Sequence, residues 1–145
     1  MKLSPGRAVT HYLSAALFLV FAWFQRNDID PVIYHKPSSL DATAWFVFYL
    51  LIAVLFVVAV YRSLPSWILI AAVLACLAEM AVTGPGLFEN LFGQEDFSMT
   101  QVSMSAEDPR VELSREFFGA VIALAGVGYL IFTERQKKER QAKSG

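Results

Sequence analysis

Residues 111–119 read VELSREFFG, and this stretch places two carboxylates and a guanidinium at the start of an otherwise apolar helix. Glu112, Arg115 and Glu116 come directly before an apolar run over residues 117–132. An unpaired charge near a lipid core is costly, so these side chains must be paired or face a polar space. The stretch therefore marks one end of a membrane-spanning helix and a candidate polar site.

The predicted helix carries its carboxylates and its small residues on the same face. Glu112, Glu116, Gly119, Ala123 and Gly126 follow one another at intervals of three and four residues, which is the spacing of neighbours on a helix surface. Small side chains let another helix backbone approach closely in a membrane. We therefore expect Gly119, Ala123 and Gly126 to be helix-packing residues and the carboxylates to lie inside the bundle or at its mouth.

The composition also indicates a membrane protein. The 145 residues are 56% hydrophobic with a mean hydropathy of +0.48, whereas soluble domains are roughly 45–50% apolar. The net charge of −1 provides no basic surface of the kind that binds nucleic acid. A lone cysteine, Cys76, excludes an intramolecular disulfide and CxxC thiol chemistry. We expect one membrane domain over residues 1–145.

Four apolar runs predict an all-α bundle of four transmembrane helices. The first run ends in Trp23, Phe24, Gln25 and Arg26 without a small-residue cleavage site, so we expect a retained span and not a signal peptide. Residues 84–86, Gly-Pro-Gly, are expected to end the third span, with a short interfacial helix at 87–92 and either a strand or an ordered loop at 97–105. The expected spans cover residues of about 8–25, 43–61, 67–83 and 115–133.

The distribution of Lys and Arg predicts that both termini are cytoplasmic, in a plasma membrane or a bacterial inner membrane. With the amino terminus inside, eight basic residues lie on the cytoplasmic side and four outside, as the positive-inside rule requires. Residues 134–145 then form a basic, solvated cytoplasmic tail, and a long extracytoplasmic loop joins the third and fourth helices. The eight are Lys2, Arg7, Arg62, Arg135, Lys137, Lys138, Arg140 and Lys143, and the four are Arg26, Lys36, Arg110 and Arg115.

This topology brings polar residues from three separate segments to the outer side of the membrane. Glu79 interrupts the third apolar run about 20 Å from its start, at 1.5 Å per helical residue. It is expected to face the bundle with Cys76 and Thr83, either as a functional carboxyl group or as an interfacial one that reaches outward. The polar cluster comprises Gln25, Asn27, Asp28, Asp30, Glu79, Glu112, Arg115 and Glu116.

Two motifs in this cluster resemble the transmembrane protein 220 family. They are Q-x-N-D-x-D at residues 25–30, closing the first span, and E-x-x-R-E-x-x-G at residues 112–119, opening the fourth. The resemblance implies a small four-span membrane protein and a family of unknown biochemical function. The family usually has N-D-P-D, whereas Ile29 separates the two aspartates here and the proline follows as Pro31; the loop over residues 32–44 is also longer.

Three functional hypotheses follow from the sequence. The first is a non-enzymatic scaffold or partner-docking subunit, in which Arg115 neutralises Asp28 and one of Glu112 or Glu116. The second is binding or transport of a hard cation or a proton by an oxygen-rich site that adds Glu79 and Asp30 to these carboxylates.

The third hypothesis is an enzyme that uses a Glu as general base beside Arg115 as an anion clamp. The sequence contains neither an identifiable nucleophile nor a dedicated set of metal ligands, so we expect no catalytic residues, no cofactor and no enzyme activity. The expected partners are the lipid bilayer and either a membrane protein or a second copy of the chain, without nucleic acid.

Overall fold

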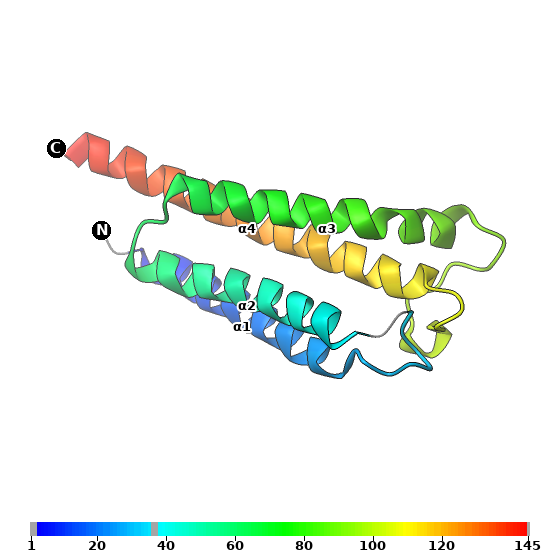
Figure 1. Ribbon diagram of the computed structural model, residues 1–145. Helices are drawn as coiled ribbons and strands as arrows, with labels where there is room; N and C mark the ends of the chain where they lie inside the picture. The colour runs from blue at the N-terminus through cyan, green and yellow to red at the C-terminus, as the bar shows by residue number, and fades with distance from the viewer. Residues whose placement is uncertain (1–2, 36–37, 145) are drawn as a thin grey trace.

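The computed structural model describes residues 3–35 and 38–144, apart from the side chains of Asn27 and Ser144. Its long helices form two antiparallel hairpins that lie side by side as two layers (Figure 1). The described residues contain no strand, so residues 97–105 form an ordered loop with one helical turn. The elements are α1 (Pro5–Phe24), η1 (Gln25–Asn27), α2 (Ser39–Tyr61), α3 (Ser66–Phe92), η2 (Gln101–Ser103) and α4 (Arg110–Ser144).

Each long helix is long and apolar enough to cross a membrane, which confirms the predicted all-α fold with four candidate spans. Helices α1 and α2 form one hairpin, and α3 and α4 form the other. The start of α1 and the end of α4 lie at one end of the bundle, while the α1–α2 and α3–α4 loops lie at the other (Figure 1). These two ends are called the terminal end and the loop end below.

Helix α3 continues through the Gly-Pro-Gly segment, so the prediction that it ends there is wrong. Residues 87–92, expected to form a separate interfacial helix, are its last turns. Gly86 is buried, and a Cβ atom there would overlap the side chain of Leu113 on α4; a Cβ at Gly84 would touch Phe117. This close contact with α4 supports the helix across Pro85, whose ring removes one backbone hydrogen bond. The α3–α4 loop is correspondingly shorter than expected.

Helix α4 continues beyond residue 133, where a solvated tail was expected, and two of its charged side chains are buried. Glu134 is 2% exposed and Lys137 4% exposed, and they form an ion pair. The Glu134 carboxylate accepts a hydrogen bond from the backbone N–H of Leu64 at 3.1 Å. The Lys137 ammonium donates to the backbone carbonyls of Ala59 and Arg62. The expectation of a solvated tail is therefore wrong for this pair, which holds the α2–α3 turn against α4.

The two hairpins meet where aromatic rings pack on the small-residue face of α4. Phe18 on α1 stacks against Tyr49 and Phe56 on α2, with ring centroids 6.3 Å and 5.9 Å apart. A Cβ atom at Gly119 would overlap the Tyr49 hydroxyl, and one at Gly126 would lie 3.0 Å from the Phe18 ring. The structure therefore places the three small residues of this face toward the bundle interior: Gly119, Ala123 and Gly126.

Replacing Gly119 by Val should destabilise the bundle, because the new side chain would collide with the Tyr49 ring system. Overpacking of this kind costs about 1–3 kcal/mol. The matched control is Gly128→Val on the same helix, where a Cβ atom meets nothing within 4 Å. We expect a lower midpoint of thermal unfolding in detergent for Gly119→Val than for Gly128→Val. Equal midpoints would contradict the packing at Gly119.

Replacing Lys137 by Met should destabilise the protein more than removing the whole ion pair does. The single variant leaves the Glu134 carboxylate buried without its partner, a loss that typically costs about 3–5 kcal/mol. The double variant Glu134→Gln/Lys137→Met has no unpaired charge and should unfold at a higher denaturant concentration than Lys137→Met. Arg135→Met, at an exposed neighbouring position, is the control. If the single and double variants unfolded at the same denaturant concentration, the unpaired buried charge of Glu134 would not be the cause of the destabilisation.

Candidate functional site

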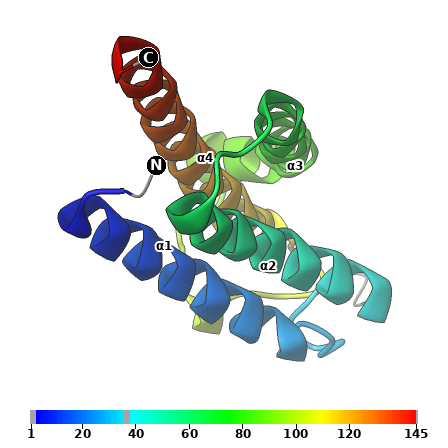
Figure 2. The same ribbon diagram turned by 90° about the vertical axis from the view of Figure 1, so that its left-hand side faces the viewer.

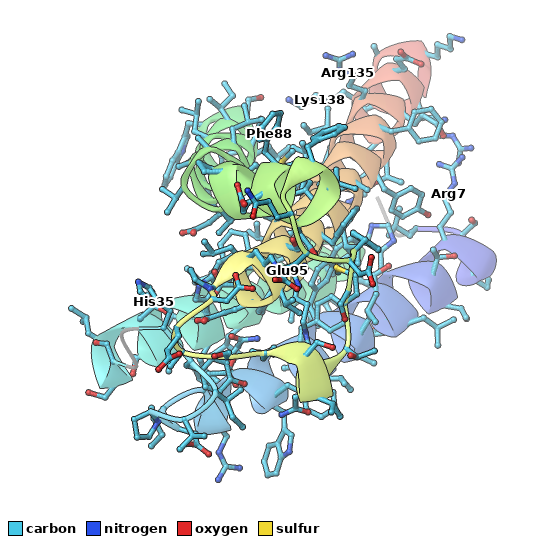
Figure 3. All side chains as sticks on the ribbon, turned by 90° about the vertical axis from the view of Figure 1, so that its right-hand side faces the viewer. Arg7, His35, Phe88, Glu95, Arg135 and Lys138 are labelled. Carbon is cyan, nitrogen blue, oxygen red and sulfur yellow. The ribbon has the colours of Figure 1, made fainter. Side chains whose placement is uncertain are left out.

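A cavity of about 780 Å³ opens at the loop end, bounded by α1, α2, α4 and the two loops. Figure 3 looks at this end, where the α3–α4 loop, which carries Glu95, crosses in front of the helices. The cavity is lined by both aromatic rings and ionisable side chains. Apolar parts of a ligand could pack against the rings, and charged parts could pair with the ionisable groups. The lining includes Phe21, Phe24, Tyr34, Trp45, Tyr49 and Phe118, together with Gln25, Asp28, Asp30, Glu112, Arg115 and Glu116.

Most of the polar cluster expected from the sequence lies around this cavity. Gln25, Asp28 and Asp30 reach it from the end of α1 and the following loop, while Glu112, Arg115 and Glu116 reach it from the start of α4. Two segments more than eighty residues apart in the sequence thus face one space. The side chain of Asn27, also assigned to the cluster, lies outside the described residues.

Glu79 lies at a second, smaller cavity of about 240 Å³ between α2, α3 and α4. Its backbone carbonyl accepts a hydrogen bond from Thr83 Oγ1 at 2.7 Å, and Thr83 is buried in the bundle. Asp41 lines the same space. Glu112 and Glu116 line both cavities. These two carboxylates therefore lie between the smaller cavity, which Glu79 lines, and the larger cavity.

Asp28 is paired with a tyrosine. Its Oδ1 accepts a hydrogen bond of 2.6 Å from the Tyr34 hydroxyl. Partial burial raises the pKa of Asp28, while the Tyr34 hydrogen bond and the positive charge of Arg115 lower it. Burial and the neighbouring carboxylate raise the pKa of Tyr34, so its hydroxyl stays protonated and remains a donor.

The predicted ion pair of Arg115 with Asp28 and with Glu112 or Glu116 is absent from the described part of the chain. Salt bridges there join Arg110 to Asp108 and Lys137 to Glu134. The Arg115 guanidinium instead donates to the sulfur of Met104 at 3.4 Å, on the α3–α4 loop side of the cavity. Tyr34 takes the position beside Asp28, which leaves the guanidinium lining the cavity without a carboxylate at contact distance.

The two loops are tied to each other and to α4 beside the cavity. The backbone N–H of His35 donates to Glu112 Oε2 at 2.8 Å, and His35 Nδ1 lies 2.8 Å from the Ala106 carbonyl. The Ala106 N–H donates in turn to the Val32 carbonyl at 3.4 Å. Asp30 Oδ1 accepts from the Val32 N–H at 2.9 Å and so fixes the turn that follows η1. Glu112 and Asp30 therefore each use one oxygen to hold a loop.

A second polar network, missed by the sequence analysis, anchors the α3–α4 loop. The buried Asn90 amide donates to the Ser98 carbonyl at 2.7 Å and to Ser114 Oγ at 2.9 Å. Arg110 donates to Asn90 Oδ1 at 2.6 Å and pairs with Asp108 at 2.7 Å. Asn90 lies in the segment expected to form an interfacial helix, so no local pattern indicated that it would be buried.

Replacing Tyr34 by Phe should raise the pKa of Asp28. The hydroxyl donates to the ionised carboxylate and stabilises that form, so its loss favours the protonated form. The shift can be measured by infrared difference spectroscopy of carboxyl protonation, with Asp28→Asn used to assign the band. Replacing Tyr12 by Phe at the terminal end is the matched control and should leave the Asp28 band unchanged. An unchanged Asp28 titration in Tyr34→Phe would contradict the hydrogen bond.

Comparison with known proteins identifies a family model that covers both the helices and the polar cluster. No curated protein and no solved structure matches the chain. Residues 17–132, which include both motifs around the larger cavity, match the family described as "Transmembrane family 220, helix". This match spans most of the chain, and within the described residues four helices are long and apolar enough to cross a membrane, so the protein belongs to this family of multi-pass membrane proteins.

Proposed function

We propose that the protein binds a small organic cation in the larger cavity. The observation that carries this proposal is the lining: carboxylates from two segments face the same space as aromatic rings, with no carboxylate in ion-pair contact with Arg115 among the described residues. Protein sites for small molecules are typically concave spaces of 300–1,000 Å³ lined by aromatic groups and a few polar ones. The cavity of about 780 Å³ falls in this range.

The balance of charge favours a positively charged ligand. Asp28, Asp30, Glu112 and Glu116 line the cavity, and Arg115 is the cation that lines it with them. Like charges on one helix turn repel, and their repulsion is stronger where water is partly excluded. A bound cation would relieve the repulsion between the carboxylates, whereas an anion would add to it.

The arrangement fits an organic cation better than a metal ion. The described residues contain no group of three or more His, Cys, Asp or Glu side chains placed to hold a metal. A calcium-like ion needs six to eight oxygen ligands at 2.3–2.6 Å. Aromatic rings attract alkylammonium groups through the ring quadrupole, by contrast, and the lining includes the exposed rings of Phe24 and Phe118. We therefore place the binding of an organic cation ahead of both the hard-cation site and the scaffold that the sequence suggested.

The proposal is one of binding without catalysis. In the lining, the described hydrogen bonds include none that joins a serine, threonine or cysteine to a histidine or carboxylate base. We also propose that the terminal end is cytoplasmic, which the eight-to-four distribution of basic residues supports, so that the cavity opens to the outer side. The membrane would be a plasma membrane or a bacterial inner membrane.

A scaffold or partner-docking subunit is the second candidate. The observation that favours it is the hydrogen bonding between the loops, in which Glu112 accepts from His35 and Arg110 donates to Asn90. In that case the polar cluster serves to hold the loop end in one shape for a membrane-protein partner or a second copy. The cavity would then need no small ligand.

The test uses the full-length protein in detergent and two probes of the same shape, choline and its uncharged isostere 3,3-dimethylbutanol. We expect calorimetry to detect choline and not the isostere, since the contact of a desolvated cation with an aromatic ring is worth about 2 kcal/mol. Glu116→Gln should weaken choline binding about tenfold or more, because it removes the attraction between the carboxylate and the ammonium charge. Glu95→Gln is the control, because Glu95 is an exposed carboxylate at the same end and outside the lining.

The alternatives predict different results in the same experiment. Equal binding of choline and its isostere, or equal losses in Glu116→Gln and Glu95→Gln, would contradict the cation site. Stabilisation by Ca²⁺ or Na⁺ in place of choline would favour an inorganic cation. Failure of every probe, together with a companion protein that copurifies in mild detergent, would favour the scaffold.

A further inference from the structure

The terminal end of the bundle carries a basic surface that the proposed cation site does not use. Helix α4 projects beyond the other three helices at this end (Figure 1), and Figure 2 looks directly at it. After residue 133, α4 exposes basic side chains and, among the described residues there, one exposed carboxylate, Glu139. The exposed basic residues at this end include Arg62, Arg135, Lys138, Arg140 and Lys143.

This part of α4 is docked against the α2–α3 turn through Glu134, Lys137 and Lys138. The buried pair of Glu134 and Lys137 binds the backbone of the α2–α3 turn. Lys138 Nζ also donates to Ser66 Oγ at 3.2 Å, at the first residue of α3. Arg135 precedes Lys138 by three residues and therefore lies on the same side of the helix. These contacts set the rotation and the depth of α4 over residues 134–138.

Aromatic side chains indicate the depth at which these basic residues lie. The hydroxyls of Tyr12 and Tyr61 are 2.6 Å apart, and both residues are exposed. Trp67 is 69% exposed at the start of α3. Exposed Tyr and Trp gather at the level of lipid headgroups. Arg62 follows Tyr61 directly, and Lys138 bonds to Ser66 beside Trp67.

We infer that Arg62, Arg135 and Lys138 bind the headgroup of an anionic phospholipid in the bilayer that the protein spans. Their depth matches that of the lipid phosphates, and this surface carries net positive charge, because Glu134 is neutralised by Lys137 and Glu139 is the one exposed carboxylate among the described residues after 133. Lys and Arg near an anionic membrane surface are attracted by about 1 kcal/mol each, or roughly fivefold in affinity. A lipid whose phosphate is balanced by its own ammonium group would gain much less.

The test measures binding of short-chain phosphatidylglycerol to the full-length protein in detergent at low salt, beside phosphatidylcholine of the same chain length. We expect the protein to prefer phosphatidylglycerol by about 100-fold, from three residues at roughly fivefold each, and to lose this preference as salt is added. Arg135→Gln/Lys138→Gln should lower the preference to about fivefold, the contribution left by Arg62. Arg135→Lys/Lys138→Arg keeps both charges and should retain it.

The matched control is Arg26→Gln, which removes an exposed positive charge at the loop end. It should leave the preference for phosphatidylglycerol unchanged. The inference would be overturned if the double Gln variant kept the full preference, if Arg26→Gln lowered it equally, or if the charge-conserving variant lost it. Equal competition by inorganic phosphate would also overturn it, because the site would then recognise free phosphate and not a lipid.

Discussion

The packing of Phe18, Tyr49 and Phe56 on the small residues of α4 is the contact on which the rest of the structure depends. Lipid tails are as apolar as the helices, so helices associate in a membrane through close packing and not through the hydrophobic effect. Rings from the α1–α2 hairpin fit against α4 because glycines at 119 and 126 leave room for them. Gly119 and Tyr49 also line the larger cavity, so the cavity begins where this packing ends.

The charged groups are divided between the two ends of the bundle and are satisfied in different ways. At the terminal end, Glu134 and Lys137 form an ion pair and hydrogen-bond to the backbone of the α2–α3 turn, so each charge is neutralised within the protein. At the loop end, carboxylates face an open space. A buried ion pair that is fully bonded fixes a structure, whereas excess charge around a cavity is available to a ligand.

The four apolar helices and the approach of residues 25–30 and 112–116 to one cavity could be predicted, because apolar length and helical spacing are properties of the sequence itself. The departures arise from contacts between distant segments. Helix α3 continues across Pro85 because α4 packs against it. Glu134 and Lys137, three residues apart, have the sequence pattern of a solvated ion pair, and they are buried because the α2–α3 turn covers them. Likewise Tyr34, which carries no charge, takes the place beside Asp28 that the sequence assigned to an arginine.

The two carboxylates at the start of α4 have different roles although they are one helical turn apart. Glu112 accepts the His35 N–H and so is committed to the α1–α2 loop. Glu116 lines both cavities and has no side-chain hydrogen bond to another described residue. Loss of Glu112 would release a loop, and its effect on binding would be indirect. Under the proposed function, ligand recognition is expected to depend mainly on Glu116, because neither of its carboxylate oxygens is committed to a hydrogen bond with another described residue.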